Sequence, residues 1–129
     1  MSRQFGHFAV QFPNIATVAD NVAQTTEQAR IAIPYDANVV GIIAHAGTCD
    51  DALSAVDIYD EGLDTPATVL GADVTVAVAD TVYNGLVSST YASTEYKKGR
   101  MFTVRVSTTQ TSGGIDNLQV TLILKKLDY

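Results

Sequence analysis

Residues 101–125 read MFTVRVSTTQTSGGIDNLQVTLILK, and this stretch decides the fold class. On either side of the Thr/Ser/Gly-rich segment 108–114, apolar and polar residues alternate. A period of two is typical of a strand with one buried face and one solvated face. The pattern predicts two neighbouring β-strands joined by a loop. Their buried face is expected to carry Phe102, Val104, Val106, Leu118, Val120, Leu122 and Leu124.

Two further strands are predicted upstream, in residues 28–46. In residues 28–33, Ala29, Ile31 and Ile33 alternate with Arg30 and Ala32. Pro34 then ends the hydrogen-bonded strand or marks a sheet edge. Residues 38–46 are apolar on both faces, as expected of a strand buried between layers. This stretch ends close to His45, one of two histidines in the chain.

The middle of the chain adds several shorter strands. Residues 52–59, 68–70 and 73–79 have strand patterns, and a weaker strand near 86–87 follows a turn predicted at Asn84-Gly85. The 129-residue chain also holds 15 valines and 15 threonines, and β-branched residues favour strands over helices. We therefore expect one all-β domain, an antiparallel β-sandwich or barrel of about eight short strands.

Residues 1–27 differ from the rest, so we divide the chain into an N-terminal arm at 1–27 and a β-sandwich domain at 28–129. The arm has few charges and scattered apolar residues. Ile15, Val18, Ala19 and Val22 have helical spacing after Asn14, so one alternative is a short helix capped by Asn14. The other alternative is an extended arm. Such a phenylalanine-rich segment is expected to pack on its own domain or on a partner.

Composition excludes several classes of partner. The pI of about 4.5 argues against DNA or RNA as the main partner, because nucleic-acid-binding proteins normally carry a basic surface. The apolar runs are too short for a membrane span, and the N-terminus has no signal-peptide pattern. A single cysteine, Cys49, fits a protein made in the cytosol. Acidic residues gather in 31–80 and basic residues in 95–126, which suits contacts between copies or two solvated faces.

The candidate chemical sites are weak. His45, Cys49 and the neighbouring acids match no zinc pattern. Calcium binding by Asp57, Asp60, Glu61 and Asp64 remains a minor hypothesis, since their order does not follow the EF-hand loop. No nucleophile or phosphate-loop motif occurs, and the proximity of Asp57 and Asp60 does not by itself make a glycosidase pair. We expect no enzyme, no catalytic residue, no metal site and no cofactor.

The order of features from residue 31 onward resembles one family. An Ile-x-Ile-Pro-Tyr-Asp-Ala element at 31–37 leads into Val-Val-Gly-Ile, VDIYD follows at 56–60, and a Lys-Gly-Arg turn precedes a closing LQVTLILKK strand at 118–126. This pattern is similar to the small jelly-roll proteins encoded among the structural genes of tailed bacteriophages, especially capsid decoration (cement) proteins.

The resemblance implies a jelly-roll-like sandwich with an N-terminal arm. It also implies a structural virion protein that is made in the host cytoplasm and binds the outer surface of the capsid. The partners would be the major capsid protein and other copies of the chain, usually as a homotrimer. The residues proposed to anchor the arm at the capsid or oligomer interface are Arg3, Phe5, Phe8 and Phe12.

The alternative function is a receptor- or carbohydrate-binding module of a phage tail or fibre. Such modules stack sugars on exposed aromatic rings. The candidate residues for this role are Tyr35, Tyr59, Tyr83, Tyr91, Tyr96 and Tyr129.

Overall fold

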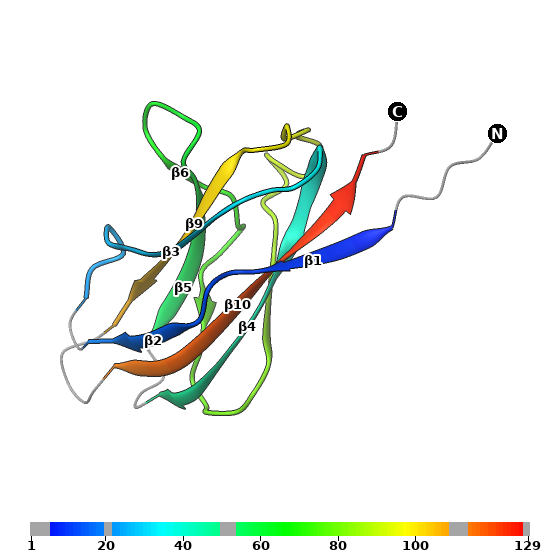
Figure 1. The fold of residues 1–129 in the computed structure, drawn as a ribbon. Coiled ribbons are helices and arrows are strands. Elements are labelled where there is room, and N and C mark those ends of the chain that lie inside the picture. Colours follow the sequence, from blue (N-terminus) through cyan, green and yellow to red (C-terminus); the bar gives the residue numbers. More distant parts are fainter. Residues whose placement is uncertain (1–5, 20–21, 50–53, 109–113, 128–129) are drawn as a thin grey trace.

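A computed structural model describes residues 6–19, 22–49, 54–108 and 114–127 (Figure 1). Within these residues the secondary structure consists of strands, and no helix that could cross a membrane is found. The strands are β1 (His7–Gln11), β2 (Ile15–Val18), β3 (Glu27–Ala32), β4 (Ala37–Cys49), β5 (Ala55–Asp60), β6 (Ala67–Thr68), β7 (Val74–Thr75), β8 (Tyr83–Leu86), β9 (Met101–Ser107) and β10 (Ile115–Lys126).

The strands form two antiparallel sheets packed face to face. Sheet A has the order β1-β10-β4-β8, with β2 beside β1 on the same edge of β10. Sheet B has the order β3-β9-β5-β6, with β7 also beside β5. Because β1 and β2 share one position and β6 and β7 share another, the strands fill eight positions. Apart from the step from β5 to β6, the chain changes sheet between successive positions, which is the topology of a jelly roll. The predicted fold class is confirmed.

The core lies between the sheets and comes from the alternating strands. The inward residues of β9 (Phe102, Val104 and Val106) and those of β10 from Leu118 to Leu124 are fully buried, as predicted. Ile42 of β4 and Ile58 of β5 meet them from the neighbouring strands. Apolar side chains therefore fill the space between the layers, and the solvent-facing features lie on the outer faces and loops.

The described part of residues 1–27 belongs to this sandwich. β1 and β2 pair with β10, and the amide of Phe12 between them donates to the carbonyl of Val120 at 2.9 Å. The helical alternative is wrong for Ile15–Val18, which form β2. Ile15 and Val18 are both buried although they are three residues apart, and they pair with Leu118 and Ile115, which show the same spacing. The edge of β10 supplies hydrogen-bond partners to the extended backbone of this segment, and the core covers both of its apolar side chains.

The predicted turn at Asn84-Gly85 is also wrong, because both residues lie inside β8. A Cβ on Gly85 would lie 2.4 Å from a methyl carbon of Val74, on the opposite sheet. Glycine is required here because β7 and β8 approach closely at this edge. The predicted strand at 73–79 is correspondingly short, with only Val74–Thr75 in β7.

Candidate functional site

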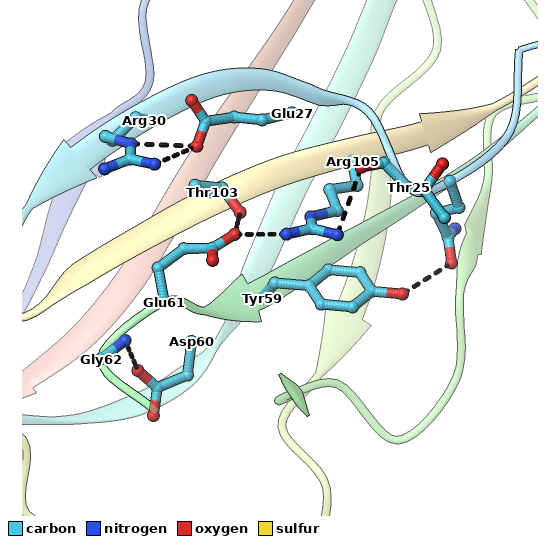
Figure 2. A network of polar contacts seen from close by, with 10 residues as sticks. Thr25, Glu27, Arg30, Tyr59, Asp60, Glu61, Gly62, Thr103 and Arg105 are labelled. Atoms are coloured by element: carbon cyan, nitrogen blue, oxygen red, sulfur yellow. Dashed lines mark hydrogen bonds and ion pairs between the residues drawn. The ribbon is translucent and has the colours of Figure 1, made fainter. Parts of the chain in front are cut away.

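The outer face of sheet B carries a charged network centred on Glu61 (Figure 2). Its carboxylate accepts a hydrogen bond from Thr103 Oγ1 at 2.6 Å and pairs with the guanidinium of Arg105 at 2.7 Å. Partial burial acts to raise the pKa of Glu61, but these two partners outweigh it and the pKa lies below its usual value. The same face carries the exposed ion pair Glu27–Arg30. This network binds β9 to the end of β5, and the lowered pKa keeps the Glu61 carboxylate ionised at neutral pH.

Arg105 also covers the ring of Tyr59. Its guanidinium carbon lies 4.4 Å from the ring centroid, and the Tyr59 hydroxyl donates to Gln24 at 3.3 Å. Figure 2 shows the tyrosine lying under the arginine with its hydroxyl turned toward the segment before β3. One face of this ring is therefore occupied by a cation–π contact.

The acids of residues 57–64 separate in the structure. Asp60 is 3% exposed. Its carboxylate accepts two hydrogen bonds from Arg100, one from Nε and one from a terminal nitrogen, each at 2.8 Å. Glu61 is engaged by β9, and Asp64 is exposed in the turn. These carboxylates do not converge on one point, and within the described ranges no three His, Cys, Asp or Glu residues gather into a metal-sized group.

Asp57 and Asp60 point to opposite sides of β5. Asp57 lies on the outer face and is 3% exposed; Thr68 Oγ1 donates to it at 2.6 Å. The carboxyl group of Asp73, from the segment before β7, lies near it. Burial raises the pKa of Asp57 to about 6; the Thr68 bond opposes this rise and the contact with Asp73 adds to it. The carboxyl neighbour of Asp57 is thus Asp73 and not Asp60, which sequence proximity does not reveal.

The two histidines lie on sheet A. His45 is half-buried on the outer face of β4 opposite Gln119, and His7 is exposed in β1 opposite Lys125. Cys49 ends β4 and is half-buried. Since His45 and His7 lie in different rows of the sheet, the fold does not bring the two imidazoles together.

The proposed interface residues fall into three groups. Arg3 and Phe5 lie outside the described residues. Phe8 is half-buried, and its ring meets that of Tyr35 edge-on with centroids 5.5 Å apart. Phe12 is 1% exposed in the core of its own chain, so its side chain is not available to a partner while the domain is folded.

Most of the candidate stacking tyrosines are covered. Tyr96 is buried, Tyr59 carries Arg105, and Tyr83 and Tyr91 are half-buried. Tyr35 is 47% exposed, but the ammonium of Lys126 lies 4.2 Å from its ring centroid. Tyr129 lies outside the described residues. The described tyrosines do not form an open platform for a sugar ring.

The outer face of sheet A contrasts with that of sheet B because its centre carries no charged residue. Strand register places side chains on this face in three rows. The rows are Leu86–Gly41–Ile123–Ala9, Asn84–Ile43–Thr121–Gln11 and His45–Gln119. In the part of the chain that the structure describes, charged residues on this face appear only beyond these rows, at Lys125 on one end and Asp116 on the other. We call these three rows the neutral face.

Several apolar side chains on or beside the neutral face are exposed. Leu86 is 73% exposed and Ile43 is 36% exposed, and Val82, just before β8, is 59% exposed. Residues 38–46 were expected to be covered on both faces, but a two-layer sandwich covers only one face of β4. The sequence signal for this surface was the apolar run on both faces of residues 38–46. In a two-layer sandwich, such a strand must leave one apolar face uncovered.

A hollow of about 510 Å³ lies at one end of sheet A. It is bordered by the start of β4, the end of β10 and residues 92–95, with Val40, Val87 and Leu127 among its apolar lining and Glu95 and Lys125 among its charged lining. It adjoins the neutral face through Val87, which follows Leu86. The hollow and the neutral face together form the candidate interaction surface.

Comparison with known proteins finds no matching family, no similar curated protein and no similar solved structure.

Proposed function

We propose that this chain is a structural virion protein, a phage capsid decoration protein that binds the outer surface of the major capsid shell and stabilises it. The observation that carries the proposal is the neutral face of a jelly-roll domain. An exposed sheet face without charges is suited to docking on a protein surface, because no ionised group has to lose its hydration. Jelly rolls are common in viral capsid proteins.

The stabilising mechanism is mechanical. Each copy lies across the junction of several capsid subunits, with Ile43, Val82 and Leu86 packed against apolar capsid residues. The copies associate as a homo-oligomer, a trimer in this proposal. Many modest contacts repeated over the shell oppose the outward pressure of packaged DNA, and no chemical step is involved. The charged network on sheet B faces solvent.

Co-sedimentation with native and expanded phage capsids tests the proposal. The wild-type protein is expected to pellet with capsids in a fixed ratio. Leu86→Lys is expected to weaken binding at least tenfold, because it places a charge in the docking face. Leu63→Lys is the matched control: Leu63 is 43% exposed in the turn after β5, so this variant should bind as the wild type does.

Two outcomes would contradict the proposal. Absence of binding to either capsid form would remove the decoration role. Equal binding by Leu86→Lys and wild type would show that the neutral face is not the docking surface. Binding to a panel of host-surface glycans without capsid binding would support the alternative, a receptor- or carbohydrate-binding module.

A further inference from the structure

β1 is an open edge of sheet A, and its backbone polar groups point in a defined direction. The amide of Phe12 donates to Val120 at 2.9 Å and the amide of Lys126 donates to Gly6 at 3.3 Å. In an antiparallel pair, hydrogen-bonded and non-hydrogen-bonded positions alternate. The backbone N–H and C=O groups that face β10 are therefore those of the even-numbered residues Gly6, Phe8, Val10 and Phe12. The N–H and C=O groups of His7, Ala9 and Gln11 point away from β10.

These three residues are exposed, and within the described ranges β1 pairs with β10 alone. The open edge thus presents a row of three donors and three acceptors. Such an edge is a template for pairing with another strand, and proteins normally protect it with charges, prolines, bulges or short strands. β1 has the sequence HFAVQ, which contains no proline, glycine, Asp, Glu, Lys or Arg.

The other sheet edges are protected. β3 carries Glu27 and Arg30 and has a register shift between Glu27 and Ala29. The edge beside β5 is divided between β6 and β7, each two residues long. β8 has four residues and contains Gly85. Among the described strands, the edge formed by β1 and β2 is therefore the unprotected one, and β1 is the longer of these two strands.

We propose that β1 pairs antiparallel with β1 of a second copy of this chain, about a two-fold axis at Ala9, so that two A sheets become one continuous sheet. In this register Ala9 faces Ala9 of the partner and His7 faces Gln11. All three outward donors and acceptors of each copy are then satisfied, which makes six hydrogen bonds across the interface. A two-fold axis suits this contact because the same edge serves both copies.

The side chains fit the same arrangement. His7, Ala9 and Gln11 lie on the outer side of the sheet, so no pair of like charges meets across the axis. The small side chain of Ala9 lies on the axis. On the inner side, the half-buried Phe8 and Val10 face each other between copies, which covers apolar surface that one copy leaves exposed. The two neutral faces then join along their β1 borders.

The pairing does not depend on capsid binding. It is a contact between free copies in solution and can be measured without capsids. If copies also form trimers, two trimers that pair through all three of their β1 edges form an assembly of twice the mass.

Sedimentation velocity over a wide range of protein concentration tests the pairing. The wild type is expected to form a species of twice the mass that Ala9→Pro shows. Proline is tolerated on an edge strand where its missing N–H faced solvent, so Ala9→Pro should fold and melt close to wild type. Leu86→Lys, at the opposite edge of sheet A, should keep the wild-type mass. A wild type whose mass equals that of Ala9→Pro at every concentration would overturn the proposal.

A covalent test decides the question if Ala9→Pro fails to fold. Directly opposed residues in a hydrogen-bonded antiparallel pair have Cα atoms about 5.5 Å apart, within the range that a disulfide bridges. Ala9→Cys in a Cys49→Ser background is expected to oxidise to a disulfide-linked dimer. Leu86→Cys in the same background is the control and should remain unlinked. Equal or absent cross-linking in the two variants would contradict pairing at β1.

Discussion

At the scale of single residues, the fold decides which ionisable groups carry charge. Asp60 and Glu61 are adjacent in sequence, yet each has its own arginine, Arg100 and Arg105. Asp57, two residues before Tyr59 on the same face, instead meets a second carboxyl group, Asp73, beside Thr68. Of the acids that suggested a calcium loop, Asp60 and Glu61 therefore belong to two separate ion pairs, Asp57 lies beside Asp73, and Asp64 is exposed in the turn. The sequence shows the acids but not their partners, which come from distant segments.

The Asp57–Asp73 pair predicts a pH effect on stability. The pKa of Asp57 rises from 3.8 to about 6 on folding, so the native state binds the proton more tightly than the unfolded chain. This group therefore stabilises the fold most in acid. Its contribution falls as pH rises from about 4 to about 6 and is then constant. Asp73, Tyr59 and the Arg105 guanidinium are the titratable or charged groups around it.

The variant Asp57→Asn removes the titration and keeps the shape. Its free energy of unfolding relative to wild type is expected to increase between pH 4 and pH 7 by on the order of 1–3 kcal/mol. Urea unfolding across this range measures the difference. Asp64→Asn, at an exposed carboxylate, is the control and should show no such trend. A constant difference for Asp57→Asn would contradict a raised pKa of Asp57 in the folded protein.

At the scale of elements, the N-terminal strands are the clearest departure from expectation. Residues 14–22 have helical spacing, but the edge of β10 pairs with Ile15–Val18 and Asn117 of β10 adopts a φ of 52° beside them. That left-handed residue changes the alternation, which places Ile115 and Leu118 both in the core. The three-residue spacing of the buried Ile15 and Val18 therefore results from an irregular pairing with β10 and not from a helix. Local periodicity cannot separate this case from a helix, because only the partner strand supplies the difference.

Phe12→Ala tests whether this segment belongs to the core. Phe12 is 1% exposed, so removing its ring should lower the free energy of unfolding by about 3–5 kcal/mol. Phe8→Ala, which removes a half-buried ring, should cost clearly less. Chemical denaturation of the three proteins gives both numbers. If Phe12→Ala unfolds at the wild-type denaturant concentration, the segment behaves as a separate arm.

At the scale of the whole molecule, the sandwich has two unlike outer faces. Sheet B is charged and internally bonded through Glu61, Arg105 and Tyr59, whereas the centre of sheet A is neutral and exposes Ile43 and Leu86. One core joins β1 and β2 to the rest, and nearly all of its contacts link strands that are distant in sequence. The two faces therefore share one hydrophobic core.

A single unfolding transition is expected for this reason. Far-ultraviolet circular dichroism reports on all strands, and the chain has six tyrosines and no tryptophan, so tyrosine fluorescence reports on the packing of both sheets. The two signals should give the same midpoint, as in a two-state domain. An earlier transition in which only the amides of β1 and β2 lose protection from hydrogen exchange would contradict the single unit.

Local sequence patterns are enough to predict the all-β class and much of the core. Phe102, Val104 and Val106, together with the alternating residues of β10, were predicted as buried and are buried, because a period of two is a local property of the chain. Only the tertiary structure decided that Gly85 lies in a strand pressed against Val74, that β4 leaves Ile43 exposed, and that Asp57 meets Asp73. Each of these depends on which strand lies alongside or across the core, and that pairing joins residues that are far apart in the chain.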